Sequence, residues 1–292
     1  MKALFIVNRR SGVRRRRDVA RIIRESCTWD YGIAESERKE DLDWIIDEAA
    51  RSGVDVVYAV GGDGTVHEIA KRLIDKPLAL GILPTGSGNG FARHIGLPMN
   101  LRLSLQACSK MRIEEIDTAT VNSIPFIGTM GIGFDAWVAE QFASSSVRGL
   151  RTYAAIAIRG FLRYEAGEYE ITIDGAHQRR TALIIAIANA SQYGNNARIA
   201  PVASLQDGLL DVVMIDRLSP LAIPAAGARL FRGTLDRAKG VSMVRGRAIE
   251  IRRAAAGPAH VDGEPLTLPE HLTINVVPRS LRVLLPDRAQ RV

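Results

Sequence analysis

The chain has 292 residues, of which 47% are hydrophobic and 24% are charged, and its 39 basic and 32 acidic side chains leave a formal net charge of +7. This length fits about two globular domains, and the composition excludes a disordered protein, a peptide hormone and a disulfide-stabilised mini-scaffold. The positive balance favours anionic partners such as nucleotides, nucleic acids or acidic lipid headgroups.

Most of the excess positive charge lies at the N-terminus. Residues 1–30 contain nine basic and three acidic side chains, a balance of 9 − 3 = +6, so the rest of the chain carries only 7 − 6 = +1. The run Arg14 to Arg17 stands within this group, which spans Arg9 to Arg24. These arginines could steer ATP, dock on an anionic membrane or form a solvated helix face, and the sequence leaves the three alternatives open.

Cysteine content and hydropathy indicate a cytoplasmic protein. Two cysteines, Cys27 and Cys108, are too few for a disulfide framework and lack the spacing of a zinc site. The N-terminal apolar run passes directly into polar residues, without the longer apolar region of a signal peptide. The longest weakly charged stretch, residues 181–191, is too short to cross a bilayer, so we expect any membrane contact to be peripheral.

Strand and helix signals alternate in the first part of the chain. Apolar runs predict buried strands at 4–7, 54–60 and 78–83, and amphipathic spacing predicts helices at 18–27, 40–51, 67–73 and 91–95. Glycine-rich turns separate strand from helix at two of these junctions. The repeated order of strand, glycine turn and helix predicts a parallel α/β sheet.

After about residue 117 the pattern changes to short strands. Residues 168–173 alternate polar and apolar side chains, Asp174-Gly175 is a hairpin signal, and 181–188 is a second apolar strand. Further short strands are predicted at 210–215, 248–251, 260–261, 272–277 and 281–285. We therefore expect an α/β domain over residues 1–117 and a mainly antiparallel β domain over 118–279.

The first glycine-rich turn, Gly61-Gly62-Asp63-Gly64-Thr65, directly follows a buried strand and precedes a helix. Backbone N–H groups and a helix N-terminus at such a junction form an anion-binding nest, and glycines let a phosphate approach closely. The turn therefore predicts a nucleotide phosphate site. The alternative is a tight turn in which Asp63 or Thr65 only caps the helix.

A second turn, residues 83–91 with the sequence LPTGSGNGF, repeats this placement. Loops at the carboxyl ends of neighbouring parallel strands line one crevice, so the two turns could grip one polyphosphate. Neither turn has the Gly-Lys-Ser/Thr ending of a Walker A motif or the Gly-x-Gly-x-x-Gly spacing of dinucleotide folds. The chain also has no HRD or DFG element, so P-loop, dehydrogenase and protein-kinase functions are disfavoured.

Several aspartates have no local structural explanation. Asp63 would place a negative charge inside a phosphate nest, which requires a divalent cation such as Mg²⁺ or a donor hydroxyl between them. Asp135, Asp207 and Asp262 also lie beside or near glycines, but Asp-Gly is a favoured hairpin dipeptide and could account for the last two. Asp174-Gly175, between alternating strands, fits the hairpin alone.

Together these segments resemble the diacylglycerol kinase catalytic-domain family, which includes bacterial lipid kinases and the sphingosine and ceramide kinases. The matching segments, in chain order, are Asn8 to Gly12, Gly61 to Glu68 (GGDGTVHE), Pro84 to Arg93, Gly131 to Ala136 (GIGFDA), Asn189 with Tyr193-Gly194, Ile199 to Pro201, Asp207 to Asp211 and Asp262 to Glu264. Arg9 replaces a proline of the family motif. Gly90 stands where many bacterial diacylglycerol kinases have Asp, which leaves the identity of the lipid open.

The resemblance implies an N-terminal α/β nucleotide domain of the NAD-kinase type, a C-terminal antiparallel β-sandwich, and a last segment, 280–292, that returns to the first domain. It implies ATP and Mg²⁺ as cofactors. The residues that it implies for ATP binding are Asn8, Ser36, Gly61, Gly62, Asp63, Gly64, Thr65, Glu68, Gly86, Ser87, Asn89 and Glu264.

The resemblance also implies three catalytic carboxylates. Asp262 matches the general base proposed for the family, Asp63 would hold a metal-linked water or orient the attacking hydroxyl, and Asp135 falls near the lipid headgroup or the Mg²⁺ network. A structural cation is implied at Asp207 together with the carbonyl groups of Leu210 and Val212.

The expected reaction is transfer of the γ-phosphoryl group of ATP to a hydroxyl of a lipid such as diacylglycerol or a sphingoid base, at a membrane surface. A soluble-substrate kinase of the NAD-kinase type and a non-catalytic nucleotide-binding regulator are the alternatives. Nucleic acid is not an expected partner, because aromatic residues make up only 5% and do not interleave with the arginines. The sequence leaves the oligomeric state open and is compatible with a homodimer.

Overall fold

The computed structural model describes residues 1–8, 16–144, 150–161 and 163–286. The chain divides into unit 1, Met1–Ile116 with Arg279–Val292, and unit 2, Asp117–Pro278. Strands β5 (Arg112–Val121) and β16 (His271–Leu285) each run from one unit into the other. Residues 9–15, which hold the start of the arginine run, lie outside the described residues.

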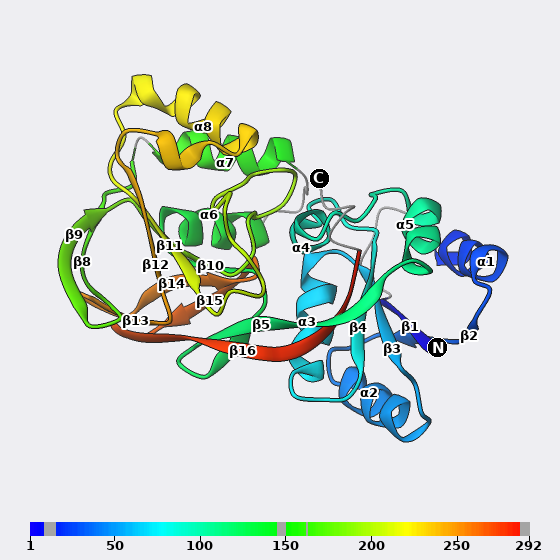
Figure 1. The fold of residues 1–292 in the computed structure, drawn as a ribbon. Coiled ribbons are helices and arrows are strands. Elements are labelled where there is room, and N and C mark those ends of the chain that lie inside the picture. The colour runs from blue at the N-terminus through cyan, green and yellow to red at the C-terminus, as the bar shows by residue number, and fades with distance from the viewer. Residues whose placement is uncertain (9–15, 145–149, 162, 287–292) are drawn as a thin grey trace. The chain divides into compact units, whose positions relative to one another are not determined.

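Unit 1 is built on a parallel sheet (Figure 1). Its strand order is β2-β1-β3-β4-β16, and β16 joins parallel to β4 through Val283 and Leu80. The other strands are β1 (Lys2–Asn8), β2 (Asp30–Ser36), β3 (Val56–Gly61) and β4 (Ala79–Pro84). The helices are α1 (Arg16–Ser26), α2 (Asp41–Arg51), α3 (Asp63–Leu73), α4 (Gly90–His94) and α5 (Leu101–Cys108). The predicted parallel α/β arrangement is confirmed.

Helices cover this sheet because its central strands are apolar on both faces. Strands β3 and β4 are buried along their whole length, as expected for parallel strands between two helix layers. Phe5 of β1 and Tyr58 of β3 stack with 4.6 Å between ring centroids, and they share a core with apolar residues of α1 and α5. The alternate residues of the same strands face the other side of the sheet.

Helix α3 begins four residues before the position that its apolar pattern predicts. Its first residue is Asp63 rather than His67, and the N-cap is Gly62, whose backbone is extended with φ −95° and ψ −169°. Asp63 in the first turn interacts favourably with the positive end of the helix dipole. The glycine-rich motif therefore forms the helix N-terminus itself, which apolar periodicity does not detect.

Unit 2 is an antiparallel β-sandwich, which confirms the predicted class. One sheet has the order β12-β11-β10-β7-β14-β15, and the other contains β16-β13-β8-β9 with β5 and β6. Its strands are β6 (Ile124–Phe126), β7 (Thr129–Gly133), β8 (Gly167–Ile173), β9 (Ala176–Ala182), β10 (Ile184–Ala188), β11 (Leu210–Ile215), β12 (Val241–Gly246), β13 (Ala248–Arg253), β14 (Gly257–Val261) and β15 (Glu264–Leu268).

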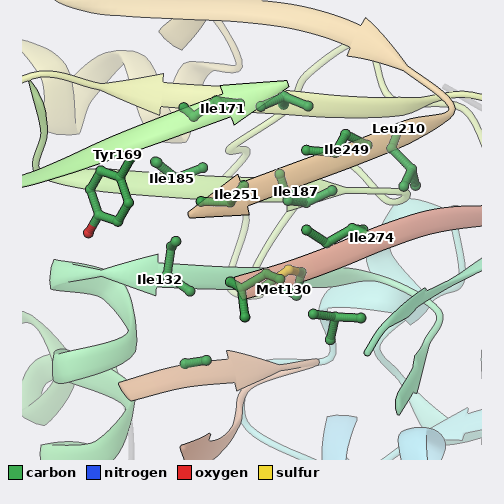
Figure 2. Close-up of a cluster of buried hydrophobic side chains, with 14 of the residues drawn as sticks. Met130, Ile132, Tyr169, Ile171, Ile185, Ile187, Leu210, Ile249, Ile251 and Ile274 are labelled. Carbon is green, nitrogen blue, oxygen red and sulfur yellow. The ribbon is translucent and has the colours of Figure 1, made fainter. Parts of the chain in front are cut away.

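Figure 2 shows the core of the sandwich, which is formed by side chains from both sheets. Ile132 of β7 and Ile185 of β10 come from one sheet, and Ile171 of β8 and Ile251 of β13 come from the other. All four are buried. Because side chains alternate along a strand, the intervening residues of β7 face the opposite side of their sheet, where the polar residues described below gather.

Three features of unit 2 differ from the sequence pattern. The predicted strand at 181–188 is divided at Leu183, whose N–H donates to Ile215 and whose carbonyl accepts from Phe134. The two apolar runs at 272–277 and 281–285 form one strand, β16. The helices α6 (Phe134–Ala143), α7 (Leu150–Phe161) and α8 (Ile223–Arg232), and the short turns η1 (Pro220–Ala222) and η2 (Leu235–Arg237), were not predicted.

Candidate active site

The carboxyl ends of the parallel strands of unit 1 bring several predicted nucleotide-binding residues to one sheet edge. Asn8, the last residue of β1, is the register partner of Ser36, the last residue of β2. Gly61 at the end of β3 is the partner of Pro84 at the end of β4. Both glycine-rich turns therefore leave the sheet at the edge where Ser36 is buried, which is where open α/β sheets bind ligands.

The two glycine-rich turns touch each other. A Cβ atom on Gly86 would overlap the Cα atom of Gly62, and a Cβ atom on Gly62 would lie 3.1 Å from the Cα atom of Gly86. The carboxylate of Asp63 also accepts a hydrogen bond of 2.6 Å from the backbone N–H of Gly90. The turns thus form one surface of bare backbone at the N-terminus of α3, the kind of surface that phosphate groups bind.

Asn89 and Arg93 hold the second turn in shape. Asn89 Oδ1 accepts from the N–H of Gly86 at 3.1 Å, and Asn89 Nδ2 donates to the carbonyl of Gly86 at 2.9 Å. Arg93 Nε donates to the carbonyl of Gly88 at 3.0 Å, a contact that the sequence did not indicate. Ser87 is exposed in this turn. Asn89 therefore shapes the loop, and binding of a phosphate by the exposed Ser87 stays a prediction.

Asn8 connects the first matched segment to the glycine-rich motif. Its Nδ2 atom donates to Thr65 Oγ1 at 3.2 Å, and Thr65 is buried in the first turn of α3. A Cβ atom on Gly61 would overlap the Thr65 side chain, so a glycine is needed where β3 ends. Residues from β1, β3 and α3 therefore pack together at the carboxyl ends of the two strands.

Glu68, one turn further along α3, forms ion pairs with three cations, and its contact with the nucleotide stays a prediction. Its carboxylate lies 2.8 Å from Lys39 Nζ, 2.8 Å from Lys71 Nζ and 2.7 Å from Arg72 Nη1. Burial raises the pKa of this carboxyl, but the hydrogen bonds from the three cations outweigh burial and lower the pKa to about 2. Arg72 also pairs with Asp43 of α2 at 2.7 Å, so the network ties α2 to α3.

In unit 2, the carboxylate of Asp262 is held by three backbone donors. Asp262 follows β14 in the turn to β15, with a left-handed φ of 50°. Its side chain accepts hydrogen bonds from the N–H groups of Ile127, Gly128 and Thr129 at 3.0, 2.8 and 3.0 Å. Its own N–H donates to the carbonyl of Thr129 at 2.7 Å. The residue therefore serves the hairpin turn and also presents a carboxylate in a defined orientation.

Asn189 fixes the segment that supplies these donors. Its Nδ2 atom donates to the carbonyls of Asp117 and Ile127, both at 2.8 Å, and its backbone N–H donates to the carbonyl of Gly128 at 2.8 Å. The Asn189 side chain is fully buried. The role of this matched residue is thus to position the backbone that binds Asp262.

Asp135, at the start of α6, is the centre of a buried polar cluster. Its Oδ2 atom accepts from the Tyr193 hydroxyl at 2.8 Å and lies 3.2 Å from Nε2 of His260. A Cβ atom on Gly131 would overlap both the carboxylate and the imidazole. Asp135 and His260 are each only 4% exposed. His260 was not among the predicted site residues, because its place opposite Gly131 depends on the register of β7 and β14.

The Asp207 region already contains a positive charge. Arg245 Nη1 lies 3.7 Å from Asp207, and Arg245 Nε lies 3.2 Å from Asp211. Burial raises the pKa of Asp211, and Arg245 opposes that effect. Leu210 and Val212, the other predicted cation ligands, are both in β11. Among the described residues no group of three or more His, Cys, Asp or Glu is placed to hold a metal ion, and the cation at Asp207 stays a prediction.

The predicted site residues therefore fall into two groups. Unit 1 brings together Asn8, Ser36 and the two glycine-rich turns, with Glu68 behind them in α3. Unit 2 holds Asp135 and Asp262, and Glu264 is exposed at the start of β15.

Comparison with known proteins finds matches over both units. Residues 2–121 match the diacylglycerol kinase catalytic domain, and residues 128–285 match the YegS C-terminal domain, described as NAD kinase beta sandwich-like. A relative from Enterobacter sp. (strain 638) named "Probable lipid kinase YegS-like" is 31% identical over 287 residues, which cover 95% of this chain and 91% of the relative.

A relative from Yersinia enterocolitica with the same name is 29% identical over 288 residues, covering 96% of this chain and 93% of the relative. A crystal structure described as a diacylglycerol kinase from Bacillus anthracis strain Sterne has a TM-score of 0.77 at 21% identity. The similarity covers 99% of this chain and 97% of that one, and at this identity it shows a shared fold.

Proposed function

Because the chain belongs to the family of diacylglycerol kinase catalytic domains with a YegS-type C-terminal domain, we propose that it transfers the γ-phosphoryl group of ATP to a hydroxyl of a lipid such as diacylglycerol or a sphingoid base. The observation that carries the proposal is the contact of Gly62 with Gly86 at the N-terminus of α3. Two glycine-rich turns in contact at a helix N-terminus suit the negatively charged oxygens of a polyphosphate.

The phosphates of ATP would lie against Gly62, Asp63, Gly64 and Thr65. The first N–H groups of a helix have no partners within the helix, and the helix dipole adds a partial positive charge there. Gly62, the N-cap residue, has no side chain that could cap them. Ser87 in the facing turn would add a hydroxyl donor to the same phosphates.

Asp63 is the residue that would hold Mg²⁺ here. Mg²⁺ keeps several water ligands and is usually bound by one or two carboxylates together with the substrate phosphates, so a single carboxylate beside the nest fits this ion. When bound, the ion would neutralise charge on the phosphates. The hydrogen bond from Gly90 to Asp63 keeps the carboxylate beside the nest.

Asp262 is the proposed acceptor of the lipid hydroxyl proton. The three N–H donors from residues 127–129 fix its orientation and stabilise its negative charge. A loose phosphoryl-transfer transition state needs little proton removal at its start, so Asp262 would first orient the hydroxyl and take the proton late. Asp135, which contacts His260 of β14 and Tyr193, would help to position the strand that leads to Asp262.

The acceptor lipid would be reached from the cytoplasmic side of a membrane, where ATP is present. In the described part of the chain no helix combines the length and the apolar content needed to cross a bilayer. We therefore propose that the enzyme meets its substrate by peripheral contact.

The test is transfer of label from γ-labelled ATP in the presence of Mg²⁺. The purified chain is given vesicles that contain diacylglycerol, sphingosine, ceramide or phosphatidylglycerol and, separately, soluble NAD. We expect label in a phosphorylated lipid, and removal of Mg²⁺ by EDTA should abolish it. Label only in the NAD product would establish the NAD-kinase alternative, whereas nucleotide binding without any labelled product would establish a regulator.

A further inference from the structure

The segment of residues 217–234, called here the η1–α8 segment, exposes an apolar surface at the edge of unit 2 (Figure 1, yellow). Helix α8 has the mostly apolar sequence IPAAGARLFR, yet none of its 10 residues is buried. A helix on the surface of a globular protein normally turns its apolar residues inward and its polar residues outward. This helix departs from that arrangement.

The outward stripe of the η1–α8 segment is apolar. Leu221 is 93% exposed and Phe231 is 43% exposed, and Pro224 and Ala225 between them are also exposed. Pro224 and Ala225 lie three and four residues after Leu221, and Phe231 lies seven residues, about two helical turns, after Pro224, so these side chains follow one side of the segment. Leu230 projects from the other side and packs against a buried cluster of unit 2. The helix is thus anchored by one side and leaves its second apolar side uncovered.

The charged side chains of the segment itself are all positive. The segment contains Arg217, Arg229 and Arg232 and no Asp or Glu. Within the part of the chain that the structure describes, no carboxylate is paired with any of the three. Asp216, immediately before the segment, is paired with Arg180 at 3.1 Å. An apolar stripe beside unpaired arginines is the composition of a helix that lies in the interface of an anionic bilayer.

Trp44 of α2 is also an exposed apolar residue, but its charged neighbours differ from those of the η1–α8 segment. Trp44 on α2 is 68% exposed, but it lies between Asp43 and Asp47 on a helix that begins with Asp41. Asp43 is paired with Arg72 and Asp47 with Lys76, so that surface has no excess positive charge to attract anionic lipid. The η1–α8 segment differs from Trp44 in that its exposed apolar side chains lie beside arginines with which no carboxylate of the described residues pairs. Ile158 of α7, which is 67% exposed and precedes Arg159, shares this combination.

We propose that the η1–α8 segment docks the protein on bilayers that contain anionic phospholipid. Leu221 and Phe231 insert among the headgroups, and Arg217, Arg229 and Arg232 meet lipid phosphates. The inference rests on the proposed function only in that a lipid kinase must collect its substrate from a bilayer. Docking itself needs no phosphoryl transfer, so the two can fail separately.

The test measures co-sedimentation of the full chain with vesicles of equal parts phosphatidylcholine and phosphatidylglycerol, and with phosphatidylcholine alone. The double variant Leu221→Glu/Phe231→Glu should bind the mixed vesicles at least about tenfold more weakly. Arg229→Gln and Arg232→Gln should each weaken binding to the mixed vesicles roughly fivefold and leave binding to pure phosphatidylcholine unchanged. Trp44→Glu, which adds one negative charge at an exposed apolar residue of α2, should bind like the wild type.

Kinase assays separate docking from catalysis. The double variant should phosphorylate a water-soluble, short-chain diacylglycerol at the wild-type rate and lose activity on long-chain lipid in vesicles in parallel with binding. Vesicle binding that depends on Leu221 and Phe231, without phosphorylation of any lipid, would support docking and refute the proposed function. Unchanged vesicle binding of the double variant would overturn docking, and a simultaneous change from dimer to monomer in sedimentation velocity would assign the stripe to a second copy of the chain.

Discussion

The Cα atom of Gly62 occupies the space that a Cβ atom of Gly86 would need. The two residues belong to turns that leave the adjacent strands β3 and β4, and the hydrogen bond from Gly90 to Asp63 ties the same turns together. Contact between two bare backbones thereby creates the surface on which the proposed nucleotide site depends.

The contact predicts that Gly86→Ala will damage the nucleotide site. The added methyl group must displace the Gly62 backbone, so we expect a loss of about 1–3 kcal/mol in the free energy of unfolding and at least about tenfold weaker ATP binding. Urea denaturation and calorimetric titration measure the two effects. The matched control is Gly227→Ala in α8, where a Cβ atom meets no atom within 4 Å, and it should keep wild-type ATP affinity. Equal ATP affinity in both variants would refute the proposed role of the contact between Gly62 and Gly86.

The proposed role of Asp262 is tested by Asp262→Asn. An amide in place of the carboxylate would turn an NH₂ group toward one of the N–H donors of residues 127–129, which should cost about 1–3 kcal/mol of stability. At a temperature where the variant is folded, we expect ATP binding like the wild type and a loss of at least about a hundredfold in lipid phosphorylation.

Asp174→Asn is the matched control for that experiment. Asp174 also precedes a glycine and has a left-handed φ of 46°, and its carboxylate accepts from the N–H groups of Arg247 and Ala248. The predicted hairpin at Asp174-Gly175 is thus present, with an added contact to β13. The N–H groups of Ala248 and Arg247 lower the pKa of Asp174. Asp174→Asn should lose stability but retain phosphorylation, and similar turnover in the two variants would remove Asp262 from the mechanism.

The ion pairs of Glu68 with Lys39, Lys71 and Arg72 predict how the stability of the protein depends on pH. The Glu68 pKa of about 2 in the folded protein lies below its unfolded value of about 4.3, so the paired carboxylate stabilises the folded state above about pH 4.3. This stabilisation is lost as the pH falls toward 2. Glu68→Gln should therefore cost about 3 kcal/mol at pH 7, and the difference from the wild type should shrink by about 2 kcal/mol at pH 3.

Urea denaturation at the two pH values checks this expectation. Glu140→Gln, at an exposed position on α6, serves as the control and should show no such change. A difference between wild type and Glu68→Gln that is the same at pH 7 and pH 3 would show that the three cations do not hold the carboxylate ionised in the folded protein.

Tyr193→Phe tests the buried cluster around Asp135. The substitution removes the hydroxyl that donates to Asp135 Oδ2 at 2.8 Å and keeps the aromatic ring. We expect a loss of about 1–3 kcal/mol in the free energy of unfolding, because a buried carboxylate loses one of its donors. ATP affinity should not change, since the proposed phosphate site lies in unit 1. As a control, Tyr31→Phe in β2 should alter the free energy of unfolding by less than about 0.5 kcal/mol. An equally small effect of Tyr193→Phe would show that the Tyr193 hydroxyl does not stabilise the buried carboxylate of Asp135.

The local features of the fold could be predicted from the sequence. The apolar runs that become β3 and β4, the glycine turns that follow them and the hairpin at Asp174 all depend on residues close together in the chain. The onset of α3 at Asp63 was not predicted, because glycine and aspartate at a helix N-terminus give no apolar periodicity. The division of the strand at Leu183 also depends on partners far along the chain.

By itself the sequence determined the α/β and antiparallel β classes and the positions of the two glycine-rich turns, because side-chain periodicity and turn chemistry act over a few residues. Only the tertiary structure decided which groups meet. The partnership of Asp135 with His260 depends on the register of β7 and β14. The ion pairs of Glu68 with Lys39 and of Arg72 with Asp43 depend on how α3 packs beside the segment that contains α2. Such pairings join residues distant in the chain, and they are settled by packing and burial of charge rather than by any local pattern.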